Sequence, residues 1–497
     1  MTDVDDQLKE ACGVVALHAP GRPADQSVAQ LTYLGLFALQ HRGQEAAGMA
    51  VSDGEQLTVV KDQGLVASVF DDRTLAGLPG HLAIGHCRYS TTGSSTWRNA
   101  QPAYRSVEDH MFALGHNGNL VNTEALVKEA GMLEGTVTSD SDLVAELIAA
   151  ELAHHPGEPD ALVRAVSDVV VQLEGAFSLV IMDQTRVIGV RDPHGFRPLC
   201  LGTLEGGGHV LASETPALDI VGATFARELA PGEMVVIDAE GVREVYPYDP
   251  SEVDPRLCLF EFVYFARPDS RLYSQSVHQA RIRMGEQLAA QAPIEADMVM
   301  GVPESGVPAA EGFARASGIP LGSGLVKNRY IGRSFIAPSQ EARARAVRMK
   351  LNPLRENIDG KRLVVVDDSI VRGTTQHQLV RMLREAGARE VHLRIPSPPV
   401  RWSCFYGIDT GDRTELLAHR LEVDEIRGYL DVDTLAYLDL DRLVAATGAA
   451  GAGFCDACFT GRYPVPVPVT LRKDVLEDNE MPTSETIVQP VLDGTTA

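Results

Sequence analysis

The sequence predicts two domains of different architecture, an α+β domain built on antiparallel sheet and an α/β domain built on a parallel sheet. Residues 12–246 contain many short β-branched runs broken by Gly and Asn, which is typical of antiparallel strands and their turns. Residues 258–468 alternate apolar strands with longer helical stretches, which is typical of a parallel sheet covered by helices. Between them, the Pro- and Asp-rich YPYDPSEVDP at 246–255 predicts a linker over 247–257.

The periodicity also predicts the individual elements. In the first domain we expect helices at 28–40 and 141–152, and strands at 57–60, 82–85, 179–182, 187–190 and 233–237. In the second domain we expect strands at 298–302, 362–366 and 391–395, alternating with helices at 276–290 and 375–386. Residues 469–497 are polar, acidic and without periodicity, so we expect a mobile tail.

Composition narrows the classes of function. The chain has 497 residues and 44% apolar content, enough for two or three globular domains. Its formal net charge of −24 disfavours nucleic acid and anionic membrane surfaces as partners. No apolar stretch is long enough to span a membrane, and residues 1–11 lack the features of a signal peptide, so a cytoplasmic location is expected. Seven cysteines, an odd number, indicate reduced thiols, catalysis or metal binding.

The most specific local pattern is RLVVVDDSIVRGTT at 362–375. A buried strand delivers Asp367 and Asp368 at its carboxyl end, where open α/β sheets bind ligands. Gly373, Thr374 and Thr375 then open a helix whose N–H groups and hydroxyls can hold a phosphate. The two carboxylates suit a sugar diol or a magnesium ion that carries diphosphate.

An acidic strand end of an NTPase would produce a similar pattern, and so would a plain strand, turn and capped helix. The NTPase is disfavoured because no G-x-x-x-x-G-K-[ST] motif occurs in the chain. The pattern resembles the signature with which type I phosphoribosyltransferases bind phosphoribosyl pyrophosphate.

The N-terminal CGVVAL at 12–17 extends this resemblance to the amidophosphoribosyltransferases, also called glutamine phosphoribosylpyrophosphate amidotransferases. The family makes phosphoribosylamine, the first committed step of purine synthesis, and joins an N-terminal nucleophile (Ntn) hydrolase αββα sandwich to a type I phosphoribosyltransferase domain. The similarity runs from Cys12 to about Pro464. The matching stretches are LQHRGQEAAGM at 39–49, GHCRYSTTG at 85–93, HNGNL at 116–120, TSDSD at 138–142, RDPHGFRPL at 191–199, FEFVYFARPDS at 260–270, GVPESG at 301–306 and KNRYIGRSFIAPSQ at 327–340.

The resemblance gives Cys12 a chemical role. On its own, Cys12 before Val14 and Val15 would be explained as a small apolar residue of a buried strand. If residues 1–11 are a propeptide that is removed, Cys12 gains a free α-amino group, whose reference pKa is about 7.7–8.0, close enough to neutrality to act as base for its own thiol. The thiolate can then attack the side-chain amide of glutamine and release ammonia.

The resemblance also implies the partners of this nucleophile. The Asn117 side chain and the Gly118 backbone N–H are expected to stabilise the oxyanion. Arg88 is expected to pair with the α-carboxylate of glutamine, and Asp140 with its α-ammonium. Taken alone, these residues would have ordinary structural roles: a surface pair for Arg88, a turn for Asn117 and a helix N-cap for Asp140.

In the second domain, the resemblance implies Mg²⁺ contacts for Ser305, Asp367 and Asp368. Phosphoribosyl pyrophosphate contacts are implied for Asp367, Asp368, Ser369, Arg372, Gly373, Thr374, Thr375, Lys327 and Arg333. The stretch at 327–340 resembles the loop that folds over this substrate, which would exclude water. Because free ammonia has to travel between the two sites, we expect a sealed interdomain passage, with residues 260–270 as the coupling segment.

Four cysteines form a separate candidate site. Cys455 and Cys458 form a C-x-x-C motif, whereas Cys258 and Cys404 are distant in sequence. Four thiolates could bind zinc or an iron–sulfur cluster, or no metal at all. The iron–sulfur branch of the family has cysteines in these four contexts, so the resemblance implies a [4Fe–4S] cluster. Cys87 and Cys200 fall outside this pattern and are expected to be packing residues.

The sequence leaves two further functions open. A sibling glutamine amidotransferase would share the first half but use another acceptor. A regulator that senses phosphoribosyl pyrophosphate would keep the binding loop but would not need Cys12 or Asn117. The family further suggests a homotetramer inhibited by purine nucleotides.

Overall fold

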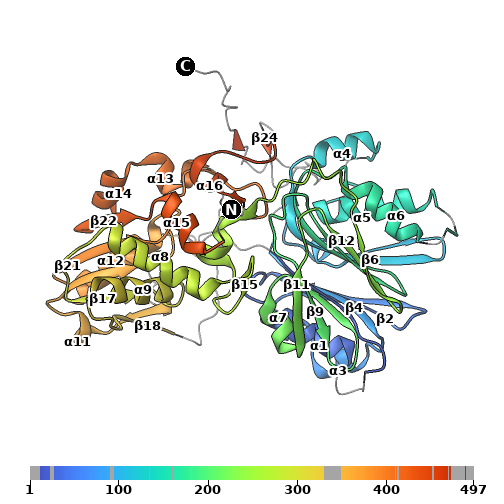
Figure 1. The fold of residues 1–497 in the computed structure, drawn as a ribbon, viewed down its shortest axis with the longest axis horizontal. Coiled ribbons are helices and arrows are strands. Elements are labelled where there is room, and N and C mark those ends of the chain that lie inside the picture. Colours follow the sequence, from blue (N-terminus) through green and yellow to red (C-terminus); the bar gives the residue numbers. More distant parts are fainter. Residues whose placement is uncertain are drawn as a thin grey trace.

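The computed structural model describes residues 12–22, 27–89, 94–133, 135–155, 157–158, 160–328, 349–408, 410, 413–449, 451, 453–467, 470–471 and 487–488. The expected propeptide at 1–11 and Arg333 lie outside the described residues, as does most of the expected tail. Figure 1 shows two halves side by side, with the first half in blue to green and the second in yellow to red.

Two antiparallel sheets pack against each other in the first half (Figure 1). The seven-stranded sheet has the order β11 (Ala223–Glu228), β9 (Cys200–Leu204), β10 (His209–Ala212), β1 (Gly13–His18), β4 (Leu82–Arg88), β2 (Ala46–Ser52) and β3 (Leu57–Gln63). The six-stranded sheet has the order β13 (Gly241–Val245), β12 (Met234–Asp238), β8 (Val187–Arg191), β7 (Gly175–Met182), β6 (His110–Leu120) and β5 (Ala103–Val107).

Side-chain alternation along β1 builds the layers of this half. Val14 and Ala16 face the core between the sheets, together with Val180 of the second sheet. Val15 and Leu17 face the opposite way, into the core beneath the helices. The helices are α1 (Val28–Ala38), α2 (Val66–Val69), α3 (Asp72–Ala76) and α7 (Thr215–Ile220) on the first sheet, and α4 (Thr123–Glu129), α5 (Asp140–Leu152) and α6 (Ala161–Val170) on the second. The expected αββα sandwich is therefore confirmed.

The second half contains a four-stranded parallel sheet covered by helices on both faces. Its strand order is β17 (Met298–Gly301), β20 (Arg362–Val366), β21 (Glu390–Ile395) and β22 (Thr434–Tyr437). Val364 and Val366 of β20 belong to one core, and Leu363 and Val365 to the other. Its helices are α8 (Val277–Gln291), α9 (Val307–Ser317), α11 (Arg355–Ile358), α12 (Thr374–Glu385), α13 (Leu417–Arg420), α14 (Val423–Leu430), α15 (Leu440–Thr447) and α16 (Ala457–Thr460).

Short elements complete the fold. They are the 3₁₀ helices η2 (Trp97–Asn99) and η4 (Arg413–Glu415), the π-helix η3 (Glu261–Phe265), and the strand pairs β14 (Leu257–Cys258) with β23 (Phe454–Cys455), β15 (Arg271–Leu272) with β16 (Gln275–Ser276), β18 (Leu325–Lys327) with β19 (Leu351–Pro353), and β24 (Thr470–Leu471) with β25 (Ile487–Val488). The parallel pair β14–β23 places Cys258 opposite Cys455.

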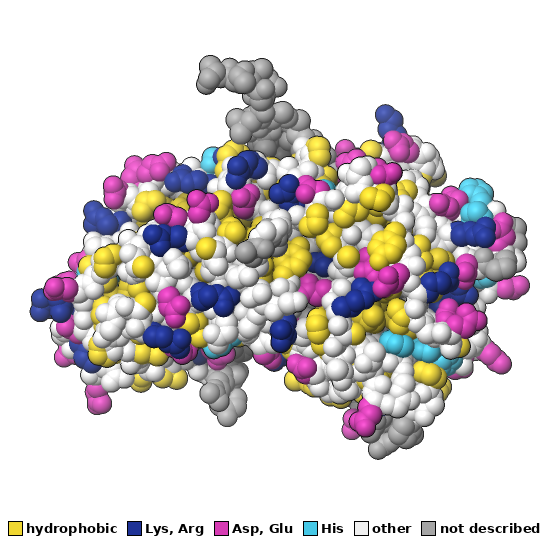
Figure 2. All heavy atoms as spheres, viewed as in Figure 1, with side chains coloured by type: hydrophobic (Ala, Val, Ile, Leu, Met, Phe, Trp, Pro, Cys, Tyr) yellow, Lys and Arg dark blue, Asp and Glu magenta, His cyan; other side chains and the backbone are white. Residues whose placement is uncertain are grey.

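Every helix and strand named from the periodicity is present, within a few residues of its expected ends. None of the helices in the described part of the chain has the length and apolar character needed to span a membrane. On the face shown in Figure 2, basic side chains are interspersed with acidic ones. The prediction that the chain has no nucleic-acid partner stays a prediction.

Candidate functional site

Cys12 lies directly before β1 and is 5% exposed. Its Sγ donates to the carbonyl of Tyr89 at 3.2 Å and accepts the Tyr89 N–H at 3.3 Å. Burial raises the pKa of this thiol to about 11, against smaller lowering effects of the Tyr89 backbone and the Arg88 charge. At neutral pH the group is therefore a thiol, and it needs a base to become a nucleophile.

A small pocket joins Cys12 to most of its expected partners. It is lined by Cys12, Arg88, Tyr89, Gln101, His116, Gly118, Ser139, Asp140 and Ser141. Arg88 ends β4, and Asp140 is the first residue of α5. The N-cap of that helix is Ser139, whose side chain accepts the N–H of Asp142 at 3.2 Å, so Asp140 is not the N-cap. A positive and a negative side chain thus face the same pocket as the thiol.

Asn117 and Gly118 lie next to each other on β6. Gly118 has φ +154°, and a Cβ there would lie 2.0 Å from the carbonyl oxygen of Ala176, so only glycine fits. Asn117 is fully buried but is not among the residues that line the pocket. Its Nδ2 donates to Ser213 Oγ at a long 3.4 Å, and its Oδ1 has no hydrogen-bond partner among the described residues.

His116 is a pocket residue to which we assigned no role from the sequence. Its Nδ1 lies 3.3 Å from Ser141 Oγ and 3.5 Å from Asp140 Oδ2, and its Nε2 lies 3.3 Å from the Ala176 carbonyl. Burial would raise the pKa of Asp140, but the charge and hydrogen bond of His116 outweigh it, together with the N–H groups of Ser141 and Leu120. The pKa of Asp140 is therefore lowered, which keeps the carboxylate ionised.

A larger cavity of about 860 Å³ adjoins the Cys12 pocket and shares Gln101, Ser139 and Ser141 with it. Lys61 and Trp97 line this cavity, and the Lys61 ammonium lies 5.5 Å from the centre of the indole ring. The larger of these two cavities therefore lies beside the thiol and not around it.

Asp367 and Asp368 directly follow β20 and are both buried. The Asp368 N–H donates to Asp367 Oδ1 at 3.0 Å, and the Ser369 hydroxyl donates to Asp368 Oδ2 at 2.6 Å. Burial, followed by the charge of Asp368, raises the pKa of Asp367 well above its usual range. A bound cation, or bound hydroxyl groups that donate hydrogen bonds, would favour the ionised form of both carboxylates.

The turn after this pair has the geometry of an anion site. Gly373 caps α12 with φ +82°, and a Cβ there would lie 2.4 Å from Leu417 Cδ2. Thr374 and Thr375 form the first turn of α12, where backbone N–H groups favour negative charge. Arg372 forms an ion pair with Glu415 at 2.8 Å.

The remaining residues expected at the second site lie on neighbouring segments. Ser305 belongs to the loop after β17, the parallel neighbour of β20, so the two loops meet at the same edge of the sheet. Gly306 of this loop packs tightly on β20, because a Cβ there would lie 2.2 Å from the Val366 carbonyl oxygen. Lys327 ends β18 and is exposed.

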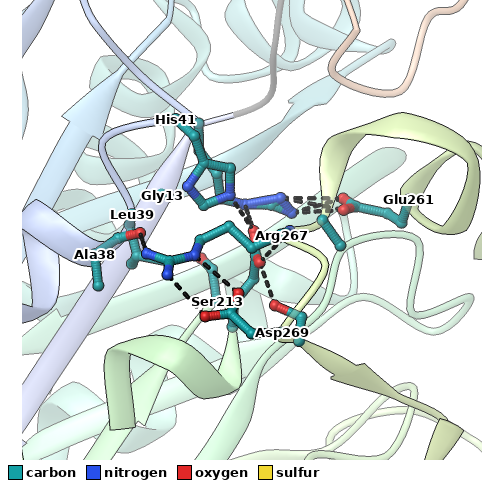
Figure 3. A network of polar contacts seen from close by, with 12 residues as sticks. Gly13, Ala38, Leu39, His41, Ser213, Glu261, Arg267 and Asp269 are labelled. Atoms are coloured by element: carbon teal, nitrogen blue, oxygen red, sulfur yellow. Dashed lines mark hydrogen bonds and ion pairs between the residues drawn. The ribbon is translucent and has the colours of Figure 1, made fainter. Parts of the chain in front are cut away.

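Buried ion pairs connect the two halves through residues 260–270, the junction segment. Arg42 Nη2 lies 2.7 and 2.8 Å from the carboxylate oxygens of Glu261, and Arg197 Nη1 lies 3.2 Å from the same carboxylate. Figure 3 shows Arg267 reaching Ala38 at the end of α1, with an Nη1–O distance of 3.1 Å. Glu214 accepts from the Arg267 N–H at 2.9 Å and pairs with His41 at 2.7 Å.

The four candidate cluster ligands come together from three segments. Cys258 and Cys455 are paired across β14 and β23, and Cys404 and Cys458 pack against the same apolar core as Cys258. All four thiols are free of disulfides. Burial, followed by the charge of the neighbouring Cys258, raises the pKa of both Cys455 and Cys458 well above the usual range. We call these four residues the four-cysteine centre.

The distances between these sulfurs bear on which metal centre the four cysteines could hold. Among the described residues, the only three His, Cys, Asp or Glu side chains with ligand atoms all within 4.8 Å of one another are Glu151, His155 and Asp168 on the α5–α6 hairpin. No three sulfurs of the four-cysteine centre, all of which the structure describes, are that close. Cys87 and Cys200 are buried in the core under the helices, as expected of packing residues.

Comparisons with known proteins agree with this arrangement. The family profile of a glutamine amidotransferase domain matches residues 86–220, and that of a phosphoribosyl transferase domain matches residues 272–396. The amidophosphoribosyltransferase of Mycobacterium tuberculosis is 52% identical over 94% of this chain and 89% of its own length. This chain belongs to the amidophosphoribosyltransferase family. A relative in Synechocystis is 50% identical over 95% of this chain and 94% of its own length.

A solved structure of the family is similar along nearly the whole chain. It is glutamine phosphoribosylpyrophosphate (PRPP) amidotransferase from B. subtilis complexed with ADP and GMP, which is 44% identical, with a TM-score of 0.83 over 92% of this chain and 98% of that one. Membership of the amidophosphoribosyltransferase family favours the transferase over the sibling amidotransferase and the non-catalytic regulator. The chain is an enzyme that catalyses the first step of purine biosynthesis.

Proposed function

We propose that Cys12 releases ammonia from glutamine and that the ammonia reacts with phosphoribosyl pyrophosphate beside Asp367 and Asp368. The products are glutamate, 5-phosphoribosylamine and diphosphate. The observation that supports the first half-reaction most directly is the pocket that joins the Cys12 thiol to Arg88, Gly118 and Asp140. An amino acid such as glutamine carries the opposite charges of Arg88 and Asp140 on its two α-substituents.

In this proposal, removal of residues 1–11 gives Cys12 a free α-amino group that takes the thiol proton. The base is needed because burial holds the thiol pKa at about 11. The Gly118 N–H and the Asn117 Nδ2 would then stabilise the oxyanion formed on the glutamine side chain. Redirection of Asn117 Nδ2 costs little, because its present bond to Ser213 is long at 3.4 Å.

In the second half-reaction, Asp367 and Asp368 would hold the ribose hydroxyls or, with Ser305, a magnesium ion. Mg²⁺ supplies charge neutralisation for the leaving diphosphate when bound. Oxygen donors at one sheet edge fit this ion, and a bound cation would favour the ionised form of Asp367, whose pKa burial and the charge of Asp368 raise. Ser369, Arg372, Gly373, Thr374 and Thr375 would bind the phosphoribosyl end, and Lys327 with Arg333 the diphosphate.

The junction segment would couple the two sites. On one side, Glu261 binds Arg42, which is close to Gly13 because a Cβ on Gly13 would lie 3.5 Å from Arg42 Cβ. On the other side, Arg281 donates to the carbonyls of Phe262 at 2.9 Å and Ala266 at 2.8 Å. A change at either active site would therefore be transmitted through buried charges, which tolerate little displacement.

The four-cysteine centre would bind a [4Fe–4S] cluster. Four thiols with no disulfide fit this donor set. A single zinc ion would need sulfurs about 3.8 Å apart, since Zn–S bonds measure about 2.3 Å in a tetrahedron. No three of these four sulfurs lie within 4.8 Å of one another, and a cluster, when bound, would cross-link segments that are distant in sequence.

We further propose that purine nucleotides inhibit the enzyme, since the B. subtilis relative was solved with ADP and GMP, and that it works in the cytoplasm as a homotetramer. The test of the proposed function is an assay of anaerobically purified protein with glutamine, phosphoribosyl pyrophosphate and Mg²⁺. We expect glutamate and diphosphate to form in equal amounts. Glutamate release without any diphosphate would contradict the proposal.

A further inference from the structure

The segment of the four-cysteine centre that contains Cys404 packs directly behind the pocket of Cys12. Asn119, the neighbour of Gly118 on β6, donates from Nδ2 to the Phe405 carbonyl at 3.0 Å. Arg197 of the first half donates from Nε to the Tyr406 carbonyl at 2.9 Å, and the rings of Phe196 and Tyr406 stack at 4.5 Å. Both hydrogen bonds connect residues more than 200 positions apart in sequence. Their acceptors are backbone carbonyls, whose positions do not depend on side-chain rotamers.

Gly407 lies against Gly118, one of the residues that line the pocket. Its φ of +99° is accessible mainly to glycine, and a Cβ there would lie 3.1 Å from both the carbonyl carbon and the Cα of Gly118. On the opposite side, a Cβ on Gly118 would lie 2.0 Å from the Ala176 carbonyl oxygen. The Gly118 backbone therefore packs closely against both Ala176 of β7 and Gly407.

We infer that residues 405–407 form the back wall of the oxyanion hole, with Gly407 as a positioning residue for the Gly118 N–H. This inference rests on the proposed function, in which that N–H stabilises the oxyanion. A donor contributes to catalysis only if it points at the place where negative charge develops, so a small displacement lowers kcat more than it weakens glutamine binding. Cys404 of the four-cysteine centre directly precedes this wall in the chain.

The test compares Gly407→Ala with Gly360→Ala in anaerobically purified protein. Gly360 has φ +72° and nothing within 4 Å of its added Cβ, so this control reproduces the backbone strain without the collision. For Gly407→Ala we expect kcat for glutamine hydrolysis, per mature chain measured by intact mass, to fall about 10- to 100-fold, as when an oxyanion donor is weakened. KM for glutamine, ammonia-dependent synthesis and cluster absorbance should stay close to those of the control.

A second variant covers the case in which Gly407→Ala does not fold. Asn119→Ala adds no volume and removes the hydrogen bond to Phe405 together with a longer one to the Leu120 carbonyl at 3.2 Å, and we expect a smaller loss in kcat of the same kind. Hydrolysis at the control rate in both folded variants, or a loss confined to KM, would overturn the inference while leaving the proposed function intact. Glutamine hydrolysis by a Cys12→Ala variant at the wild-type rate would overturn both.

Discussion

The Arg42 guanidinium and the Glu261 carboxylate form a buried ion pair across the junction of the two halves, with Nη2–O distances of 2.7 and 2.8 Å. Both side chains are at most 1% exposed. Arg197 shares the same carboxylate at 3.2 Å, and Arg42 also pairs with the buried Glu214 at 3.1 Å, so two buried carboxylates face two buried guanidinium groups. Glu261 of the junction segment is thus bound by two buried arginines of the first half.

We expect Glu261→Gln to uncouple the two activities and to destabilise the fold. Loss of the charge leaves the buried Arg197 without its ion-pair carboxylate and Arg42 with Glu214 alone, so the free energy of unfolding should fall by roughly 3 kcal/mol. Glutamine-dependent synthesis should fall further than either glutamine hydrolysis or ammonia-dependent synthesis. Denaturant titration measures the free energy of unfolding, and assays of glutamine hydrolysis, ammonia-dependent synthesis and glutamine-dependent synthesis measure the coupling. Glu240→Gln, at an exposed position, is the control. If Glu261→Gln has the stability and the coupling of the control, the ion pair between Arg42 and Glu261 contributes to neither.

Cys12→Ala should abolish glutamine-dependent formation of phosphoribosylamine while added ammonia still supports it. The reason is that only the first half-reaction uses a thiol nucleophile. Diphosphate release with either nitrogen source measures the outcome. If ammonia-dependent synthesis disappears equally in a folded variant, the assignment of two separate sites is wrong.

Replacement of both Asp367 and Asp368 by Asn should weaken binding of phosphoribosyl pyrophosphate in the presence of Mg²⁺. Two neutral amides no longer hold a magnesium ion or ribose hydroxyls as carboxylates do. Calorimetric titration measures the affinity, and basal glutamine hydrolysis serves as the control because Cys12 is untouched. Unchanged affinity would remove this role from the pair.

Cys455→Ser should lower both the visible absorbance of the cluster and the fraction of chain that lacks residues 1–11. Maturation would use the Cys12 thiol and the same oxyanion donors, which the four-cysteine centre helps to align. Intact mass and absorbance of anaerobically purified protein report both quantities. A cluster-free variant that matures at the normal rate would show that removal of residues 1–11 does not depend on the cluster. Normal glutamine turnover by the full-length chain would contradict the N-terminal nucleophile itself.

Glu214→Gln should flatten the dependence of stability on pH in the acid range. Burial raises the pKa of Glu214, but the charges of His41 and Arg42 lower it far more, to well below the ordinary value of 4.5. A lowered folded-state pKa contributes stability that is complete above pH 4.5 and is lost as the pH falls toward the folded pKa. Urea unfolding between about pH 3 and 7 should show a smaller loss for the variant. If the free energy of unfolding depends on pH in the same way for the variant and the wild type, Glu214 is not the buried carboxylate with a lowered pKa that we describe.

The sequence predicted those parts of the site whose chemistry is local. RLVVVDDSIVRGTT contains strand, carboxylates and helix start within 14 residues, and the structure places them as expected. The Cys12 pocket was predicted only as a set of separate motifs. His116 was within a quoted motif, but its contact with Asp140 depends on the packing of α5 beside β6, so no sequence signal gave it a role.

By itself the sequence determined the helices and strands with clear periodicity, the α+β and α/β architectures of the two domains and the acidic strand end, because periodicity and turn chemistry act over a few residues. Only the tertiary structure decided that Arg42 meets Glu261, 219 positions away, and that Gly407 lies against Gly118. Such contacts arise when whole sheets and loops pack at interior density, where volume and buried charge must match across segments that share no local pattern.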